Sequence, residues 1–198
     1  MYRKTYVEID CNKLKGNIIE IKSKYPDYKY YIGVVKANCY GHGIDTIQYL
    51  IEGGINYLAT SSLEEALSIR NIYKEVPILV LEPIHYEDIL VASKNNITVT
   101  IDNKEQFDKL IKNKVKIKFH LKVDSGMNRF GIKDKEIVKY IVENSNSITF
   151  LEGLFTHLSS GTGQTLLNEK RSFEESEVGL GTITDDMAVV YDISAVAG

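Results

Sequence analysis

Proline and cysteine are both scarce in this sequence of 198 residues. Only three prolines occur, and 43% of the residues are apolar, which argues against a disordered or collagen-like chain. The two cysteines, Cys11 and Cys39, lack the spacing of a metal site, and nothing suggests export. We therefore interpret them as free thiols, with no metal bound, in a chain long enough for one globular domain.

An excess of one charge and a long apolar run are also absent. The 24 Lys and Arg residues nearly balance the 27 Asp and Glu residues, so the net charge of -3 gives no electrostatic case for nucleic-acid binding. No stretch approaches the roughly 20 apolar residues that a membrane-spanning helix needs. The first residues, MYRKTYVEIDCNK, lack the apolar core of a secretory signal peptide. We expect a cytoplasmic protein with no nucleic-acid or membrane partner.

Short β-rich segments alternate with helical patterns as far as residue 155. Several of these segments are continuous apolar runs, which is typical of parallel strands covered on both faces. The expected strands are residues 30–35, 56–60, 76–81, 97–101, 116–123 and 149–155. An alternating segment, KTYVEID at residues 4–10, is a candidate for an additional strand outside this series.

The helical patterns lie between the expected strands. Apolar residues recur with the period of a helix after residue 12 and again over residues 44–51, where two glycines end the pattern. Ser62 followed by Glu65 fits a capping box, in which the hydroxyl and the carboxylate each satisfy a free backbone N–H. Further helices are expected at residues 86–94, 104–112 and 134–144.

Alternating strands and helices with short connections predict right-handed βαβ units. Such units build either an open doubly wound sheet or a (β/α) barrel, and the spacing alone leaves both open. We count six strand units up to Phe155, two fewer than a closed eight-stranded barrel has. The composition then changes, because residues 161–198 hold two basic and seven acidic residues. This change predicts a junction near Ser160.

The segment VVKANCYGHG, residues 34–43, places Lys36 at the carboxyl end of a buried strand. Open α/β sheets and barrels have their active sites at these strand ends. A lysine withdrawn from water there acts as a Schiff-base nucleophile or carries a proton. Tyr40 offers a hydroxyl on the same edge. The alternative is an ordinary surface lysine whose ammonium group extends into solvent.

Two later segments also end strands with residues that bind ligands in other proteins. In HLKVDSGMNRFG, residues 120–131, a glycine turn after the strand carries Arg129, whose planar guanidinium suits a phenolate or a carboxylate. In LEGLFTHL, residues 151–158, the strand ends at His157. The alternatives are a surface arginine and a histidine with a structural role.

The three segments, in this order, resemble those of the alanine racemases, fold-type III enzymes that use pyridoxal 5′-phosphate (PLP). The resemblance covers residues 4–160, taken as domain 1–160, and implies a (β/α)8 TIM-barrel-type domain that is incomplete, without the carboxyl-terminal β-domain. Residues 161–198 do not resemble the family, which suggests a truncation, a fusion or a frameshift. By resemblance, Lys36 holds PLP as an aldimine and then serves as a catalytic base. Arg129 contacts the PLP phenolic oxygen and the substrate carboxylate.

The resemblance assigns three further residues. Tyr40 joins the cofactor-binding set, Lys122 supports Arg129 and is carbamylated in many members, and His157 bonds an arginine that faces the pyridine nitrogen. The implied reaction interconverts L- and D-alanine, or the two forms of serine, and supplies D-alanine for peptidoglycan. The family forms homodimers, in which a catalytic tyrosine from the carboxyl-terminal domain enters the partner's site. Residues 161–198 show no such segment.

Three interpretations stay open. The chain is an isomerase of the alanine racemase type or its amino-terminal part, a non-catalytic PLP-binding module, or an inactive truncated remnant. The lysine motif of the single-barrel PLP homeostasis proteins differs from residues 34–43, which counts against the module. Racemisation needs a base on each face of Cα, and only Lys36 is identified here. The motifs favour the first interpretation for the family, and the length favours the other two for this chain.

Overall fold

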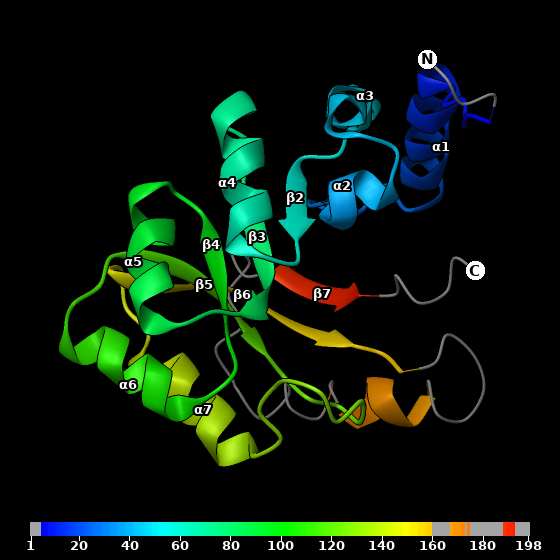
Figure 1. Ribbon diagram of the computed structural model, residues 1–198. Helices are drawn as coiled ribbons and strands as arrows, with labels where there is room; N and C mark the ends of the chain where they lie inside the picture. The colour runs from blue at the N-terminus through cyan, green and yellow to red at the C-terminus, as the bar shows by residue number, and fades with distance from the viewer. Residues whose placement is uncertain (1–4, 160–166, 173, 175–187, 193–198) are drawn as a thin grey trace. The chain divides into compact units, whose positions relative to one another are not determined.

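Helices and parallel strands alternate along the chain, as the sequence predicts (Figure 1). The computed structural model describes residues 5–159, 167–172, 174 and 188–192. These residues belong to two compact units, which meet in the sequence between Ile78 and Leu79. Among the described residues, no helix has both the length and the apolar character needed to cross a membrane.

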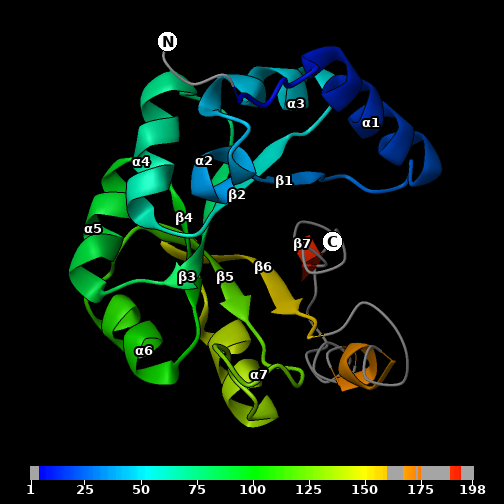
Figure 2. The same ribbon diagram turned by 45° about the vertical axis from the view of Figure 1, so that its right-hand side comes forward.

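The first unit contains two short parallel strands and the helices around them. Its elements are α1 (Cys11–Lys24), β1 (Ile32–Val34), α2 (Lys36–Tyr40), the 3-10 helix η1 (Ile44–Thr46), α3 (Ile47–Gly53), β2 (Tyr57–Thr60) and α4 (Leu63–Ile72). Strand β1 pairs with β2, with Ile32 opposite Tyr57. Helix α1 lies beside α3 (Figure 2), and the Lys15 ammonium is 2.9 Å from the Glu52 carboxylate. Gly54, at a φ of 109°, ends α3 as the glycine pair predicts.

The additional strand expected at residues 4–10 is wrong for the part that the structure describes. Residues 5–10 form no strand, and Tyr6 and Val7 are 77% and 84% exposed. Alternation stabilises a strand only where one of its faces is buried, and here neighbouring residues on both faces are in solvent. The segment ends at Asp10, whose carboxylate accepts the N–H groups of Asn12 and Lys13 and so caps α1.

The start of α4 confirms the predicted capping box. The Ser62 hydroxyl accepts the Glu65 N–H at 3.3 Å, and the Glu65 carboxylate accepts the Ser62 N–H at 3.3 Å. At the other end of the helix, buried Arg70 donates to the carbonyl groups of Tyr73, Lys74 and Val76. Burial lowers the pKa of Arg70, but a guanidinium remains charged at neutral pH. The side chain therefore holds the connection that follows α4.

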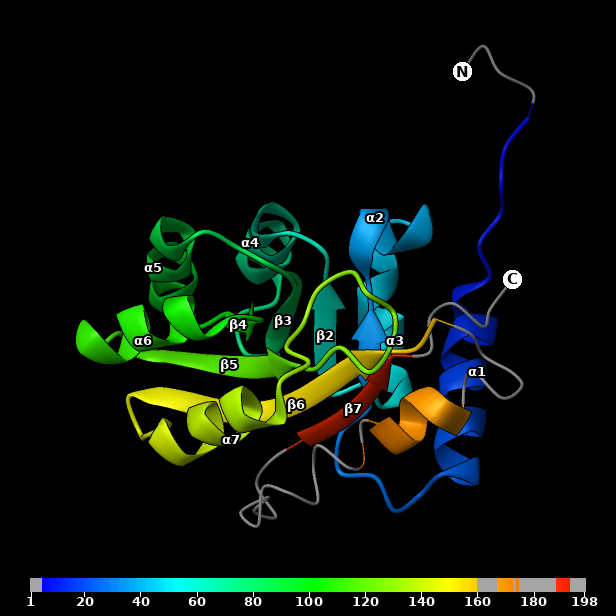
Figure 3. The ribbon, with the colours of Figure 1, turned by 90° about the horizontal axis from the view of Figure 1, so that it is seen from below.

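The second unit is a parallel sheet whose strands pair in chain order, as Figure 3 shows for β5, β6 and β7. Its elements are β3 (Ile78–Pro83, starting at the boundary), α5 (Tyr86–Lys94), β4 (Thr98–Ile101), α6 (Lys104–Lys112), β5 (Ile117–Lys122), α7 (Lys135–Asn144), β6 (Thr149–His157) and β7 (Ala188–Asp192). Strand β7 lies in residues expected to be a tail and was not predicted. The junction predicted near Ser160 falls outside the described residues.

Helices α5, α6 and α7 lie along one face of this sheet (Figure 2), and the core of the unit is between them and the strands. The rings of Phe107 on α6 and Phe119 on β5 are both fully buried, with centroids 5.9 Å apart. Tyr140 on α7 meets Phe107 edge-on at 6.2 Å. These aromatic contacts join two helices and the middle of the sheet.

Candidate functional site

Lys36 lies directly beyond the carboxyl end of β1, as the sequence predicts. The Val35 N–H donates to the carbonyl of Ala59 on β2 at 2.8 Å, so the pairing of the two strands continues up to the lysine. The Lys36 side chain is half-buried, and its Nζ lies 5.9 Å from the centroid of the Tyr40 ring. Tyr40 itself is exposed. The structure thus brings these two predicted residues together at a strand end of the first unit.

The backbone after Lys36 forms a left-handed turn that the sequence does not predict. Residues 37–40 are Ala, Asn, Cys and Tyr, and their φ angles are 51°, 53°, 57° and 53°. For a residue with a side chain this conformation costs roughly 1–2 kcal/mol. The turn is closed by the Cys39 N–H, which donates to the Val35 carbonyl at 3.0 Å. Gly41, at a φ of 84°, then leads the chain away.

A carboxylate from α4 binds the beginning of this turn. Glu65 Oε1 accepts the Ala37 N–H at 2.7 Å, and Oε2 accepts the Ser61 N–H at 2.9 Å. The capping-box pattern identifies Glu65 only as part of a helix start. Its bond to Ala37 spans 28 residues and depends on the tertiary fold, so no local pattern indicates it.

Cys39 is buried in the left-handed turn, and burial raises the pKa of its thiol. Because the thiolate is the reactive form, we expect Cys39 to react with an aromatic disulfide reagent about tenfold more slowly than half-buried Cys11. Mass mapping of the labelled peptides over time measures the two rates. In denaturant the rates should become similar, and equal rates in the native protein would contradict the burial of Cys39.

Arg129 belongs to a closed loop in the second unit, residues 123–132, which we call the arginine loop. The loop begins after Lys122, the last residue of β5, and its ends are joined by a bridge between Val123 and Ile132. The Ile132 N–H donates to the Lys122 carbonyl at 2.9 Å. Arg129 is exposed on this loop. Its guanidinium is therefore accessible to a ligand while the base of the loop is fixed to the strand.

Asp124 and two glycines determine the shape of the arginine loop. Asp124 Oδ1 accepts the N–H groups of Gly126 and Asn128, each at 3.0 Å. Gly131 has a φ of 121°, and a Cβ there would lie 2.7 Å from the Asp124 nitrogen. No other residue fits that position without a shift of the backbone. The sequence signal of a glycine turn is confirmed at this point.

Lys122 and His157 end neighbouring parallel strands of the second unit. Lys122 on β5 pairs in register with Phe155 on β6, and its Nζ lies 4.5 Å from the Phe155 ring centroid. Both Lys122 and His157 are buried. Beside them, the hydroxyl groups of Ser125 and Thr156 are 2.8 Å apart. The structure therefore places Lys122, His157 and the base of the arginine loop at the carboxyl ends of β5 and β6.

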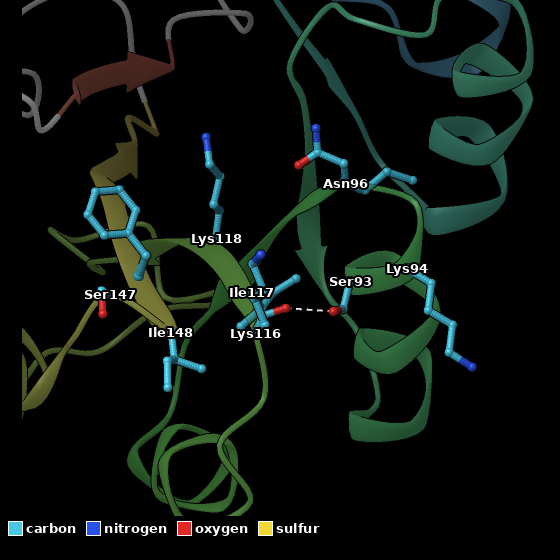
Figure 4. A pocket seen from close by; sticks show the side chains of 10 residues that line it. Ser93, Lys94, Asn96, Lys116, Ile117, Lys118, Ser147 and Ile148 are labelled. Atoms are coloured by element: carbon cyan, nitrogen blue, oxygen red, sulfur yellow. Dashed lines mark hydrogen bonds between the residues drawn. The ribbon is translucent and has the colours of Figure 1, made fainter.

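A cavity of about 360 Å³ lies at the opposite ends of the strands in the same unit (Figure 4). Its lining residues are Ser93, Lys94, Asn96, Ile97, Lys116, Ile117, Lys118, Ser147, Ile148 and Phe150. They surround the amino ends of β4, β5 and β6, where the Ser93 hydroxyl donates to the Lys116 carbonyl. Parallel α/β folds have their ligand sites at carboxyl ends, so this cavity is separate from the candidate site. No cluster of metal ligands occurs among the described residues.

Comparison with known proteins relates these features to one family. The family model described as "Alanine racemase, N-terminal domain" matches residues 9–181. The alanine racemase of Geobacillus stearothermophilus is 36% identical over 165 residues, which are 80% of this chain and 42% of that protein. Alanine racemase 1 of Bacillus subtilis is 35% identical over 164 residues, again 80% and 42% of the two chains.

A solved structure shows the same similarity in three dimensions. The alanine racemase of Bacillus anthracis with bound L-Ala-P superposes with a TM-score of 0.84 at 31% sequence identity. The match covers 96% of this chain and 52% of that one. The chain thus spans about half the length of the relatives that it matches.

Proposed function

Because this chain belongs to the alanine racemase family, we propose that it is a PLP-dependent isomerase, or the amino-terminal part of one. The fold is that of an incomplete (β/α)8 barrel, with relatives of the same fold about twice as long. The observation that supports the proposal best is the position of Lys36. A half-buried amine follows the carboxyl end of a parallel strand, within the segment that resembles the family's PLP-binding lysine motif.

The residues present fit the cofactor. Lys36 provides the primary amine that would hold PLP covalently, and Tyr40 provides a ring and a hydroxyl near that amine. When bound, PLP withdraws electrons from Cα of the amino acid and makes its proton more acidic. The planar guanidinium of Arg129 suits the PLP phenolic oxygen and the substrate carboxylate. Its exposure on the arginine loop leaves its donors available for both.

The remaining roles divide between proton transfer and support. Lys36 Nζ would accept the α-proton of the substrate and return a proton to the same face of Cα. Lys122 would brace Arg129 through the base of the arginine loop, where its carbonyl accepts the Ile132 N–H. We propose the neutral amine of its side chain as the group that is carbamylated, with loss of a proton. His157, buried at the end of β6, would orient the arginine that faces the pyridine nitrogen. This arginine is distinct from Arg129, and the resemblance places it in a later strand of the family's barrel.

We propose alanine as the substrate, since the two sequence relatives are named alanine racemases, and serine is the second candidate. The product D-alanine would serve peptidoglycan synthesis in the cytoplasm. A homodimer is the expected assembly of the whole enzyme. These assignments follow the family, because the chain covers 42% of the length of its sequence relatives.

Covalent labelling tests the cofactor site. PLP mixed with the protein should give a visible absorbance that borohydride removes, and peptide mapping should then find the reduced label on Lys36. Lys36→Ala should abolish the label because the reacting amine is gone. Lys94→Ala, which changes a lysine of the separate cavity in Figure 4, should retain it. A label spread over surface lysines and unchanged in Lys36→Ala would refute a specific PLP site.

A further inference from the structure

We propose that Glu65 is a positioning residue for Lys36, because its carboxylate holds the left-handed turn that presents the lysine amine. The inference deepens the proposed function and rests on it for the role of the amine. The geometry that carries it lies entirely within the first unit.

The turn after Lys36 needs external support. Four consecutive residues with side chains adopt the left-handed conformation, which is unfavourable for each of them. Such backbone persists only where the surrounding structure fixes it. The residues on the two sides of Lys36 are each bonded to another element. Val35 donates to Ala59 on β2 at 2.8 Å, and Ala37 donates to Glu65 on α4 at 2.7 Å.

The two oxygens of the Glu65 carboxylate have different partners. Oε2 accepts the N–H groups of Ser61 and Ser62, at 2.9 Å and 3.3 Å, and so completes the capping box of α4. Oε1 accepts the Ala37 N–H, a bond that capping does not require. A hydrogen bond to an ionised acceptor is stronger than a neutral one. Negative charge is also favourable at the amino end of a helix, so the start of α4 is a suitable position for this carboxylate.

This division of partners separates a structural role from a positioning role. Ser62→Ala removes the hydroxyl that accepts the Glu65 N–H, so it weakens the cap and leaves Oε1 on Ala37. Glu65→Asp keeps a carboxylate at the start of α4 but is one methylene too short to reach Ala37. Glu65→Ala removes both sets of bonds. A role confined to capping predicts similar effects of all three changes on Lys36.

Two readouts on these variants test the proposal. Amide hydrogen exchange of Ala37, followed by NMR without cofactor, reports its bond to Glu65. The fraction of Lys36 labelled by PLP and borohydride at limiting PLP reports presentation of the amine. We expect Glu65→Asp and Glu65→Ala to speed the exchange of Ala37 and to lower labelling of Lys36, each by about tenfold. Ser62→Ala should change neither, although its melting temperature falls.

The proposed PLP site at Lys36 and the proposed positioning role of Glu65 can fail separately. If the unaltered protein takes no label on Lys36, the PLP site is wrong, and the exchange of Ala37 still decides whether Glu65 fixes the turn. If Glu65→Ala does not fold, Glu65→Asp carries the test. The positioning role is overturned if Ser62→Ala reduces labelling as much as Glu65→Asp does. It is equally overturned if Glu65→Asp leaves both readouts unchanged.

Discussion

A polypeptide of these 198 residues, loaded with PLP, should exchange the α-proton of one alanine enantiomer with deuterated solvent faster than it inverts the centre. In the proposed reaction Lys36 would take the proton and return a deuteron on one face of Cα, whereas inversion requires a second base on the other face. The family resemblance assigns that base to a tyrosine of the carboxyl-terminal domain. Loss of a positioned base costs roughly 10²–10⁴-fold in rate, so inversion should be slower than exchange by about that factor.

Both quantities are measured on the same samples, deuterium incorporation by NMR and the enantiomer ratio by chiral chromatography. In Lys36→Ala both reactions should fall to the rate of free PLP. A separately expressed carboxyl-terminal domain of a full-length relative should restore part of the inversion. Inversion as fast as exchange in the polypeptide alone would show a second base within it. Tyr191 in β7 is then the first residue to replace.

The largest effect on stability is expected for Phe119→Ala. Phe119 is fully buried in the middle strand of the second unit and packs on Phe107 with ring centroids 5.9 Å apart. Truncation of a buried phenylalanine lowers the free energy of unfolding by roughly 3–5 kcal/mol, since apolar burial is lost and a cavity remains. Domains of this kind are stable by only about 5–15 kcal/mol. Urea unfolding followed by circular dichroism should therefore show a large shift of the midpoint.

Phe150→Ala is the matched control for this change. Phe150 lies on the neighbouring strand β6 and is 38% exposed, so less apolar surface returns to water when it is truncated. Phe150→Ala should lower the free energy of unfolding by less than half as much as Phe119→Ala does. Similar losses for the two variants would show that the core of the second unit is not centred on the Phe107–Phe119 contact.

The periodic elements are the part of the fold that the sequence predicts well. Helices α5 and α6 have the bounds that their patterns predict, and both hydrogen bonds of the Ser62–Glu65 capping box are confirmed. These features depend on residues close together in the chain. The segment at residues 5–10 has the alternation of a strand and forms none, because both of its faces are in solvent. An alternating pattern shows which side chains a strand could bury. Whether they are buried depends on the tertiary packing around the segment.

The candidate site is less predictable for the same reason. The strand-end positions of Lys36 and His157 follow from the apolar runs before them. The left-handed turn at residues 37–40 does not, because none of its four residues is a glycine that would indicate a positive φ. The Glu65–Ala37 bond joins residues 28 apart. No property of either residue alone marks that contact.

The chain-order pairing of the second unit also bears on how the protein is made. Leu79 pairs with Thr98, Val99 with Phe119, and Phe119 with Leu151, so each strand joins the one synthesised just before it. Every addition closes a loop of a few tens of residues, for which the entropy cost rises only slowly with length. The sheet can therefore grow strand by strand as the chain leaves the ribosome. The newest strand is always the open edge, and a pause in translation after β6 would expose its backbone to pairing with another nascent chain.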